Sequence, residues 1–505
     1  MTHRVELKKL LAGLVAVEPA IECLISGVTD DTRQLQPGDL FIARSGSQDD
    51  GARYTSEAVE QGAAALLVEH VGAIPRGITI PALIVPDLRQ HLAEIGSRFF
   101  GAPADRLKLI GVTGTNGKTS CTTLIAQLLQ QTALIGTRGY RYQGAMKSGG
   151  QTTPGSLRLQ EIFTELLAQG ANNVAMEVSS HALDQGRVAG LGFDTVVFTG
   201  LGHDHLDYHG DLQSYAEAKK KLFVRRARAA VINTADDLGI ELAQQLDGNC
   251  ELLTYGAPGA DLTAELVGGD LQGMTFEICI HNQKFTVRTA LIGDFNLDNL
   301  LATAGVLLLH GLTVSEVVTL LGDARPVPGR MERMDGSGPL VVVDYAHNPE
   351  GLLAALTALR APTGFTEQAN PALKPEPNPE PNPESKQGRL WCLFGCGGER
   401  DQAKRARMGE IASGTADVVV LTDDNPRHES PLQIVDQVVA GCTGSAELHR
   451  IHDRRQAITF VLQQAADQDR VLIAGKGDEP DQLFAGGRWR FDDRRIAQLA
   501  KGWRR

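Results

Sequence analysis

Short apolar runs recur along the first two thirds of the chain, each bounded by turn residues. The clearest runs are at residues 107–112, 173–178, 194–199 and 229–234. They are apolar throughout rather than alternating, which is typical of strands buried in a parallel sheet. The segment "TSCTTLIAQLLQQ" at 119–131 follows the first run and predicts a helix. Strands that alternate with helices predict an α/β domain.

The same pattern restarts after Pro328 and predicts a second α/β domain with its own parallel sheet. Its expected strands and helices lie at 340–347, 349–359, 389–398, 402–413, 417–425 and 471–477. A smaller α/β unit precedes residue 104. We therefore expect domains at 1–104, 105–328 and 329–505. A Pro-rich insertion at about 362–388, which includes "NPALKPEPNPEPNPESKQG" (370–388), is too rich in proline and charge to form a core.

Composition agrees with a multidomain globular protein. The chain has 505 residues, too many for one core, with 42% hydrophobic and 22% charged residues. Its formal net charge of −12 disfavours a nucleic-acid partner. The first residues resemble no signal peptide, and no apolar run reaches the roughly 20 residues of a membrane helix. The seven cysteines form no zinc-knuckle pattern. We expect a cytoplasmic monomer without membrane insertion.

The stretch "GVTGTNGKTS", Gly111 to Ser120, has the composition of a phosphate-binding loop. Its glycines let backbone N–H groups approach a ligand closely, at the N-terminus of the expected helix. Lys118 can neutralise phosphate charge, and the Thr119 hydroxyl can bind Mg²⁺. The spacing is shorter than usual, because Val112 stands where the common pattern has glycine. A plain glycine-rich turn between strand and helix is the simpler alternative.

Several further motifs accompany this loop, in the order "TGTNGKT", "MEVSSHAL", "DHLDYHG", "YAEAKKKLF", "GDFNLDN", "PGRME", "DYAHNPE" and "AGKGDE". Together they resemble the Mur ligases and folylpolyglutamate synthetases, which form amide bonds using ATP. The N-terminal "PGDLFIA" and "DDGARY" resemble the uridine-nucleotide domain of Mur ligases. The resemblance covers nearly the whole chain. It implies the three-domain Mur ligase architecture, with a central P-loop-type parallel sheet and a C-terminal Rossmann-like domain.

The resemblance also implies an ATP site and a metal site. Such enzymes convert a carboxylate to an acyl phosphate before an amine attacks it, which requires a held γ-phosphate and Mg²⁺. The implied ATP-binding residues are Gly114, Thr115, Asn116, Gly117, Lys118, Thr119, Ser120, Asn296, Asn299, Arg330, Asp344, His347 and Asn348. The implied catalytic residues are Lys118, Glu177, His205 and Lys219. The implied metal ligands are Thr119, Glu177, His205 and Lys219 as its carbamate.

Two of these assignments have alternatives that the residues leave open. The stretch "GHDHLDYHG" could be a zinc site of a hydrolase or a polar loop with structural histidines. It also has His203 where relatives often have arginine. Lys219 is followed by Lys220 and Lys221, and such a run normally marks a solvated helix face. The motif alignment favours Lys219 as the carbamylated residue.

Within the family, the chain resembles the ligases that add the third residue of the peptidoglycan stem peptide. Their acceptor is UDP-MurNAc-L-Ala-D-Glu, which implies contacts from Thr32, Gln48, Gln151, Thr152, Thr153, Ser179, Gln185 and Arg187. Their amine is meso-diaminopimelate, which implies contacts from Arg400, Asp424, Asn425, Pro426, Arg427, Gly475 and Glu479. Ser47, Gln151 and Asp478 stand where relatives often have His, Asn and His.

The amine is indicated by "DNPRHE", Asp424 to Glu429. Relatives that add lysine lack the arginine of this motif. Diaminopimelate differs from lysine by a second carboxylate, which a guanidinium at Arg427 can pair with. The alternatives are a Mur-type ligase for another amino acid such as lysine, a folylpolyglutamate synthetase, and a phosphate-loop switch protein without ligase activity.

Overall fold

The computed structural model describes residues 4–18, 21–45, 50–224, 227–270, 272–360 and 388–502. The chain divides into two compact units. The first contains Met1–Thr113, Gln131–Val196 and Ala218–Ala229, and the second contains Gly114–Gln130, Val197–Glu217 and Ala230–Arg505. Three elements contain a boundary between the units: β11 (Thr195–Phe198), α8 (Leu212–Lys220) and β12 (Ala229–Asn233). Among the described residues, no helix is both long and apolar enough to span a membrane.

The N-terminal part of the first unit is built on a four-stranded parallel sheet in the order β3-β4-β5-β6. The sheet and its neighbours are β1 (Val5–Glu6), α1 (Leu7–Leu10), β2 (Leu24–Ile25), β3 (Val28–Thr29), β4 (Leu40–Ala43), α2 (Thr55–Glu60), β5 (Ala65–Val68), β6 (Ala82–Ile84) and α3 (Leu88–Phe100). Side chains alternate across β4, so Leu40 and Ile42 join one hydrophobic cluster and Phe41 joins another. This matches the small α/β unit expected from the sequence.

The rest of the first unit contains strands that position the candidate site. β10 (Asn173–Glu177) lies between β7 (Lys108–Thr113) and β8 (Thr132–Gly136), parallel to both, and β9 (Gly139–Arg141) pairs antiparallel with β8. The helices are α5 (Ser156–Ala168) and α6 (Ser180–Asp184). The expected strands at 107–112 and 173–178 are confirmed. Because β10 ends at Glu177, this carboxylate lies at the carboxyl end of a parallel strand, where ligand sites are common.

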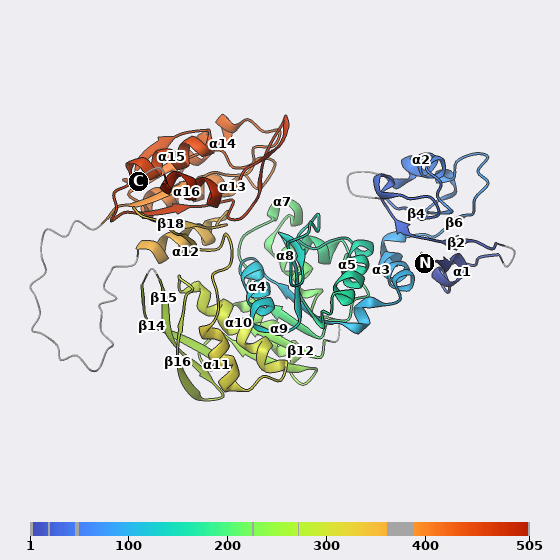
Figure 1. The fold of residues 1–505 in the computed structure, drawn as a ribbon, viewed down its shortest axis with the longest axis horizontal. Coiled ribbons are helices and arrows are strands. Elements are labelled where there is room, and N and C mark those ends of the chain that lie inside the picture. The colour runs from blue at the N-terminus through green and yellow to red at the C-terminus, as the bar shows by residue number, and fades with distance from the viewer. Residues whose placement is uncertain are drawn as a thin grey trace, which may run out of the picture. The chain divides into compact units, whose positions relative to one another are not determined.

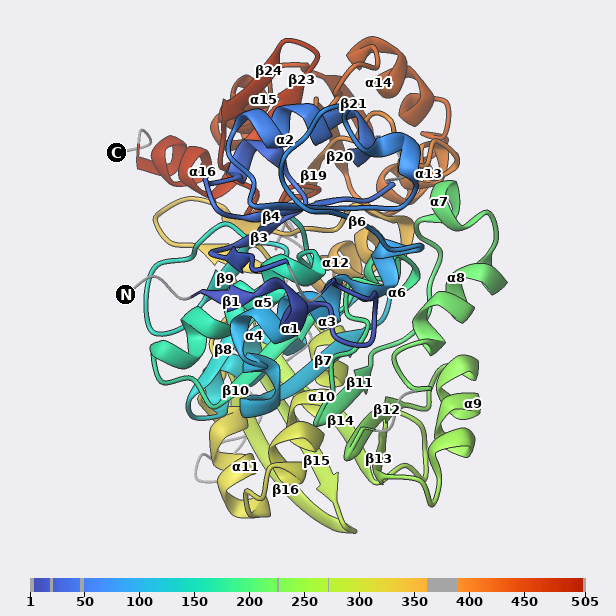
Figure 2. The ribbon, with the colours of Figure 1, turned by 90° about the vertical axis from the view of Figure 1, so that its right-hand side faces the viewer.

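The second unit begins with α4 (Lys118–Leu128), the helix expected after the glycine-rich loop. It continues with α7 (Leu206–His209), α9 (Asp237–Leu246), β13 (Glu251–Tyr255), β14 (Leu262–Asp270), β15 (Gly273–Ile280), β16 (Gln283–Thr289), α10 (Phe295–Leu309) and α11 (Val314–Gly322). Strands β14, β15 and β16 form an antiparallel meander, with α11 against β16 (Figure 2). The apolar residues of this meander alternate with polar ones instead of forming runs, so the apolar pattern of the sequence does not predict it.

The C-terminal part of the second unit is a doubly wound sheet in the order β17-β18-β22-β19-β20-β21. All neighbours are parallel except β17, which pairs antiparallel with β18. The strands are β17 (Glu332–Met334), β18 (Leu340–Val343), β19 (Leu390–Phe394), β20 (Val418–Leu421), β21 (Glu447–Arg450) and β22 (Arg470–Ile473), and a hairpin of β23 (Asp481–Phe484) and β24 (Gly487–Arg490) follows. The expected second parallel sheet is confirmed.

Helices cover both faces of this sheet, as Figure 1 shows. The helices are α12 (Pro349–Arg360), α13 (Ala403–Thr415), α14 (Pro431–Val439), α15 (Arg454–Gln464) and α16 (Asp493–Gly502). Val342 packs with α12, α13 and α14 on one face, whereas Val341 and Val343 pack with α15 and α16 on the other. The expected insertion at 362–388 lies outside the described residues except for Gly388.

Candidate active site

The glycine-rich loop adopts a conformation that requires its glycines. Gly114 and Gly117 have φ angles of 152° and 87°. A Cβ atom at Gly114 would lie 1.9 Å from the Thr199 hydroxyl, so no larger residue fits there. Lys118 begins α4, and its ammonium donates to the carbonyls of Gly114 and Thr115 at 2.8 and 2.9 Å. Ser120 is buried in the first turn of the helix. The loop therefore curls around its own lysine at a helix N-terminus.

The segment after β11 holds this loop in place. Thr199 Oγ1 donates to the Asn116 carbonyl at 2.6 Å, and the Thr115 N–H donates to the Gly200 carbonyl at 2.8 Å. The Thr115 hydroxyl accepts from the Gly202 N–H at 2.8 Å and lies 3.2 Å from the Tyr215 hydroxyl. These contacts fix the backbone of the loop before any ligand binds, which lowers the entropic cost of binding.

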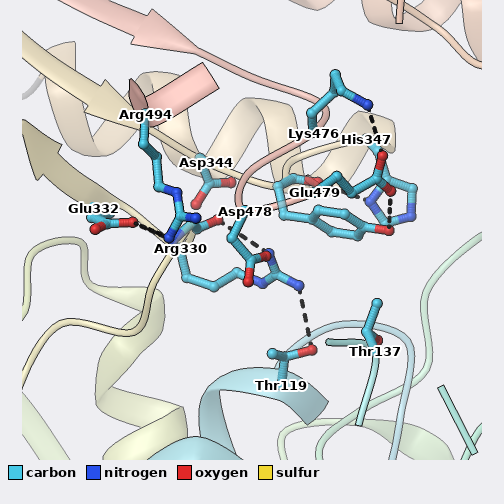
Figure 3. A network of polar contacts seen from close by, with 12 residues as sticks. Thr119, Thr137, Arg330, Glu332, Asp344, His347, Lys476, Asp478, Glu479 and Arg494 are labelled. Atoms are coloured by element: carbon cyan, nitrogen blue, oxygen red, sulfur yellow. Dashed lines mark hydrogen bonds and ion pairs between the residues drawn. The ribbon is translucent and has the colours of Figure 1, made fainter. Parts of the chain in front are cut away.

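Residues after Pro328 also reach the loop, as the resemblance implies. Arg330 Nη2 donates to Thr119 Oγ1 at 3.3 Å (Figure 3), and Asn348 Nδ2 donates to Asn116 Oδ1 at 3.1 Å. The Arg330 guanidinium stacks over the Tyr345 ring at 4.0 Å and lies 3.7 Å from the buried Asp478 carboxylate. Two of the predicted ATP-binding residues from the C-terminal part therefore contact the phosphate loop directly.

Asp344 does not contact the loop but holds the turns that do. Its carboxylate accepts from the N–H groups of Met331 and Ala346 at 2.6 and 2.7 Å. Burial raises the pKa of Asp344, against the lowering effect of Arg330 and these two hydrogen bonds. Its role in this structure is therefore to fix the segments that carry Arg330 and His347.

Asn296 and Asn299 lie buried in the first turns of α10, and Asp294 rather than either asparagine caps the helix. Asn299 Nδ2 donates to Asn296 Oδ1 at 2.9 Å, and Asn296 Nδ2 donates to the Ile292 carbonyl at 2.8 Å. The Asn299 side-chain oxygen lies 2.8 Å from where a Cβ of Gly117 would be. The pair therefore lies against the phosphate loop, where Asn299 restricts position 117 to glycine.

His205 and His347 lie on either side of the Asp204 carboxylate. The Nε2 atom of each histidine is 3.6 Å from Asp204 Oδ2. Burial acts to raise the pKa of Asp204, but the neighbouring His347, His205 and Lys404 outweigh it and hold that pKa well below its usual range. His205 has a left-handed φ of 56°, which is rare for a residue other than glycine and is often found at functional sites.

Glu177 is 2% exposed, and both of its carboxylate oxygens accept from Thr137. The Thr137 N–H lies 2.9 Å from Oε1 and the Thr137 hydroxyl lies 3.1 Å from Oε2. The Thr152 hydroxyl lies 3.2 Å from that of Thr137 and continues the network. A buried carboxylate with one hydroxyl and one amide donor keeps lone pairs for a further partner, such as a cation.

Lys219 is 1% exposed, whereas Lys220 is half-buried and Lys221 is exposed with an ion pair to Asp184 at 2.8 Å. Lys219 therefore does not lie on a solvated helix face, whereas Lys221, which directly follows α8, is exposed to solvent. Burying an ammonium is costly. Burial, like the motif alignment, distinguishes Lys219 from Lys220 and Lys221. Carbamylation of Lys219 stays a prediction.

Four predicted acceptor-binding residues form one network in the first unit. Thr153 Oγ1 donates to the Glu177 carbonyl at 2.8 Å and lies 3.4 Å from Ser179 Oγ. Arg187 Nη1 donates to the Thr153 carbonyl at 2.9 Å, and its Nε and Nη2 donate to Gln185 Oε1 at 3.0 and 2.6 Å. Thr32 is buried in a 3₁₀ turn and Gln151 is exposed. Gln48, like Ser47, lies outside the described residues.

The "DNPR" turn lies close to Arg400: a Cβ atom at Gly397 would lie 3.1 Å from Arg427 Nη1 and 3.7 Å from Arg400 Cγ. Arg427 has a left-handed φ of 56°, and its Nη1 donates to the Gly398 carbonyl at 2.6 Å. Burial and the neighbouring Arg400 guanidinium lower the pKa of Arg427. Arg427 is half-buried, whereas Arg400 is exposed. Two neighbouring cations favour an anionic ligand.

A buried ammonium lies beside this turn. Lys476 is 0% exposed and donates to Asn425 Oδ1 at 3.1 Å, Glu479 Oε2 at 2.8 Å and the Asp481 carbonyl at 2.7 Å. Asn425 Nδ2 donates to Glu479 Oε2 at 2.9 Å. Burial acts to raise the pKa of Glu479, but Lys476 outweighs it and holds that pKa below its usual value.

The remaining predicted residues of this region are close to the same turn. Asp424 Oδ2 lies 2.9 Å from where a Cβ of Gly475 would be, and Gly475 has a φ of 107°. The Pro426 carbonyl accepts from the Glu429 N–H at 3.1 Å. Carboxylates and cations therefore lie close together at this turn, as a zwitterionic ligand would require.

Comparison with known proteins agrees with this arrangement. The family patterns "Mur ligase family, catalytic domain", "Mur ligase middle domain" and "Mur ligase, glutamate ligase domain" match residues 24–100, 112–307, and 329–368 with 382–477. The chain is 41% identical over 494 residues to a UDP-N-acetylmuramoyl-L-alanyl-D-glutamate–2,6-diaminopimelate ligase of Xylella fastidiosa (strain 9a5c), covering 95% of each chain. This chain belongs to the Mur ligase family.

Other Mur ligases support the same assignment. A protein of the same name from Coxiella burnetii (strain RSA 493) is 40% identical and covers 95% of this chain and 96% of its own. A solved structure, also of that name, is 33% identical with a TM-score of 0.65 and covers 99% of both chains. MurF from Acinetobacter baumannii, at 18% identity, shares the fold with a TM-score of 0.66 and covers 94% and 96% of the two chains. The predicted three-domain Mur ligase architecture is confirmed.

Sequence reasoning missed several residues of this Mur ligase site. Thr137 and Thr199 directly follow β8 and β11, so their position after a strand could have identified them. Tyr345 and Lys476 lie inside motifs that were recognised but were not themselves chosen. No cluster of three or more His, Cys, Asp or Glu side chains suited to a metal was found in the part of the chain that the structure describes, which gives the zinc-hydrolase alternative no support.

Proposed function

We propose that this chain is an ATP-dependent amide ligase that joins meso-diaminopimelate to UDP-MurNAc-L-Ala-D-Glu in peptidoglycan precursor synthesis. The observation that carries the choice of amine is the half-buried Arg427 guanidinium on the "DNPR" turn, whose pKa is lowered by burial and by the neighbouring Arg400. A second carboxylate between them relieves their repulsion, and lysine has none to offer. The names of full-length relatives at 41% identity agree with this choice.

ATP is the phosphate donor in this proposal. The triphosphate lies against the backbone N–H groups of the loop at 114–117, where Lys118 and the N-terminus of α4 supply positive charge. Lys118 now donates to two loop carbonyls, so it exchanges them for phosphate oxygens on binding. Arg330 and Asn348 complete the nucleotide site from the C-terminal part, and Asn296, Asn299, Asp344 and His347 support it.

The side chains also fit Mg²⁺, the expected metal of this reaction. Carboxylate and hydroxyl oxygens suit this ion, and Glu177 keeps lone pairs beyond its two bonds to Thr137. The proposed ligands are Thr119, Glu177, His205 and carbamylated Lys219. The bound ion would neutralise the crowded phosphate oxygens during transfer.

The acceptor and diaminopimelate bind to different sets of residues. Thr152, Thr153, Ser179, Gln185 and Arg187 bind the dipeptide of the acceptor, with Thr32, Gln48 and Gln151 contributing to the rest of it. Arg427 and Arg400 bind one carboxylate of diaminopimelate. Asp424, Asn425, Pro426, Gly475 and Glu479 line the remainder, where carboxylate oxygens accept from an ammonium group.

The reaction then proceeds in two steps. The γ-carboxylate of D-Glu attacks the γ-phosphorus of ATP, and the bond to ADP breaks. The neutral amine of diaminopimelate attacks the resulting acyl phosphate, inorganic phosphate leaves, and the nitrogen loses a proton as the amide forms. Fixed positive charge around the loop stabilises the negative oxygens in both steps. Exclusion of water protects the acyl phosphate from hydrolysis.

Phosphate release from ATP tests the proposal. The protein is incubated with ATP and Mg²⁺, with UDP-MurNAc-L-Ala-D-Glu and diaminopimelate supplied singly and together. We expect release that requires both, and no release when folate and glutamate replace them. Release with lysine at least as efficient as with diaminopimelate, or nucleotide binding without any turnover, would refute the assignment. We also propose that the enzyme is a cytoplasmic monomer, which sedimentation of the purified chain would check.

A further inference from the structure

An ion pair between the buried Arg405 and the half-buried Glu429 joins the two loops that carry Arg400 and Arg427. Arg405, on α13, is 0% exposed. Its Nη1 and Nη2 donate to the two carboxylate oxygens of Glu429 at 2.5 and 2.8 Å. Glu429 ends the "DNPRHE" motif, and Arg405 lies a few residues after Arg400. A bidentate pair of this kind fixes both the distance and the orientation of its partners.

The same two side chains also hold the backbone of the opposite loop. Arg405 Nη2 donates to the Gly397 carbonyl at 3.0 Å. The Glu399 N–H donates to Glu429 Oε2 at 3.0 Å. Gln437 on α14 accepts from Arg405 Nη1 at 2.6 Å and restrains the arginine from a third element. The ion pair is thus bonded to the segment that leads to Arg400 as well as to the segment that contains Arg427.

The two loops are also in direct backbone contact beside this pair. The Gly398 N–H donates to the Asn425 carbonyl at 3.0 Å. A Cβ atom at Gly398 would lie 1.9 Å from the Pro426 carbonyl oxygen, so the loops are as close as glycine allows. Arg427 itself donates to the Gly398 carbonyl. A change in the spacing of the loops would therefore move the Arg427 guanidinium.

We propose that Arg405 and Glu429 are positioning residues that set the separation of Arg400 and Arg427 and so determine selectivity for an amino acid with a second carboxylate. This inference deepens the proposed function and rests on it. Neither residue touches the amino acid in this account. Arg405 and Glu429 hold the Arg400 and Arg427 guanidinium groups close to each other, although like charges repel. A substrate carboxylate can then bind between the two guanidinium groups.

The matched variants are Glu429→Gln, which keeps the shape and removes the charge, and Arg405→Lys, which keeps the charge and removes the bidentate geometry. Asp417→Asn is the control. The Asp417 carboxylate accepts from both terminal nitrogens of Arg360 at 2.7 and 2.9 Å, in the same sheet domain but outside the two loops. It therefore reports the cost of losing a bidentate ion pair, here a more exposed one, away from the site.

The measurements are KM for diaminopimelate, KM for ATP, the use of lysine, and the midpoint of thermal unfolding. For both site variants we expect KM for diaminopimelate to rise about tenfold or more, the size of one lost charge-assisted contact. KM for ATP should stay within about twofold, and the preference over lysine should fall by the same factor. Asp417→Asn should change neither KM.

The outcomes separate this inference from the proposed function. Wild-type enzyme that releases no phosphate with diaminopimelate would refute the function. Wild-type enzyme that behaves as proposed, with variants whose KM values for diaminopimelate and ATP change by equal factors or not at all, would overturn the positioning role alone. If Glu429→Gln is not recovered folded, Arg405→Lys gives the same comparison with the charge retained.

Discussion

Replacing Arg427 by alanine is the most direct test of the amino-acid site. The side chain is half-buried, already fixed by its bond to the Gly398 carbonyl, and adjacent to Arg400. Because it is fixed beforehand, little conformational entropy is lost when a carboxylate binds, and most of the interaction is retained as affinity. A hydrogen bond to a charged partner contributes about 1.5–3 kcal/mol, which corresponds to about 10- to 150-fold in kcat/KM.

We therefore expect Arg427→Ala to lower kcat/KM for diaminopimelate by that factor and to leave any use of lysine unchanged, since lysine lacks the second carboxylate. Phosphate release with each amino acid, at fixed ATP and acceptor, measures both values. His428→Ala is the control, because His428 is on the same turn but exposed, with an ion pair to Glu399 at 3.1 Å. Equal losses with both amino acids, or none with either, would refute the reasoning.

Three further predictions concern other parts of the molecule. Lys219→Ala should nearly abolish ligation while Lys220→Ala retains it, because only Lys219 is buried; equal losses in the ligation assay would contradict this. Arg330→Ala should raise KM for ATP by about tenfold without changing KM for diaminopimelate, since its guanidinium reaches Thr119. The hydrogen bond and charge of Arg405 lower the pKa of Glu429 from its usual 4.5. The ion pair therefore stabilises the folded protein fully above pH 4.5, and this stabilisation is lost as the pH falls through the lowered pKa of Glu429. The difference in unfolding midpoint between wild type and Glu429→Gln should therefore shrink on acidification below pH 4.5, and a constant difference would exclude this ion pair as its source.

The fold was predictable wherever burial leaves a continuous apolar run in the sequence. The strands that became β7, β10, β18 and β19 are apolar on both faces because helices cover both faces of their sheets, and they stand out in the sequence for that reason. The meander β14–β16 was not found, because its strands alternate and match many irregular segments equally well. The sequence therefore indicates the parallel sheets better than the antiparallel ones.

For the candidate site, motifs identify residues but not the contacts between them. The role of Glu177 at a strand end follows from its place after an apolar run. The bond from Arg330 to Thr119 joins residues that are 211 positions apart, and nothing local predicts it. The link between Arg405 and Glu429 was missed for the same reason, since a buried arginine and a surface arginine look alike in a sequence.

Because Arg427 has a left-handed backbone, the residue that is best for thermal stability at position 427 differs from the residue that is best for substrate selectivity. Glycine or asparagine would adopt this conformation more readily, whereas a long side chain adds about 1 kcal/mol or more of backbone strain. A library selected only for heat resistance should drift toward those smaller residues and lose discrimination between amino acids. Persistence of arginine under such selection would mean that its contact with the Gly398 carbonyl outweighs the strain.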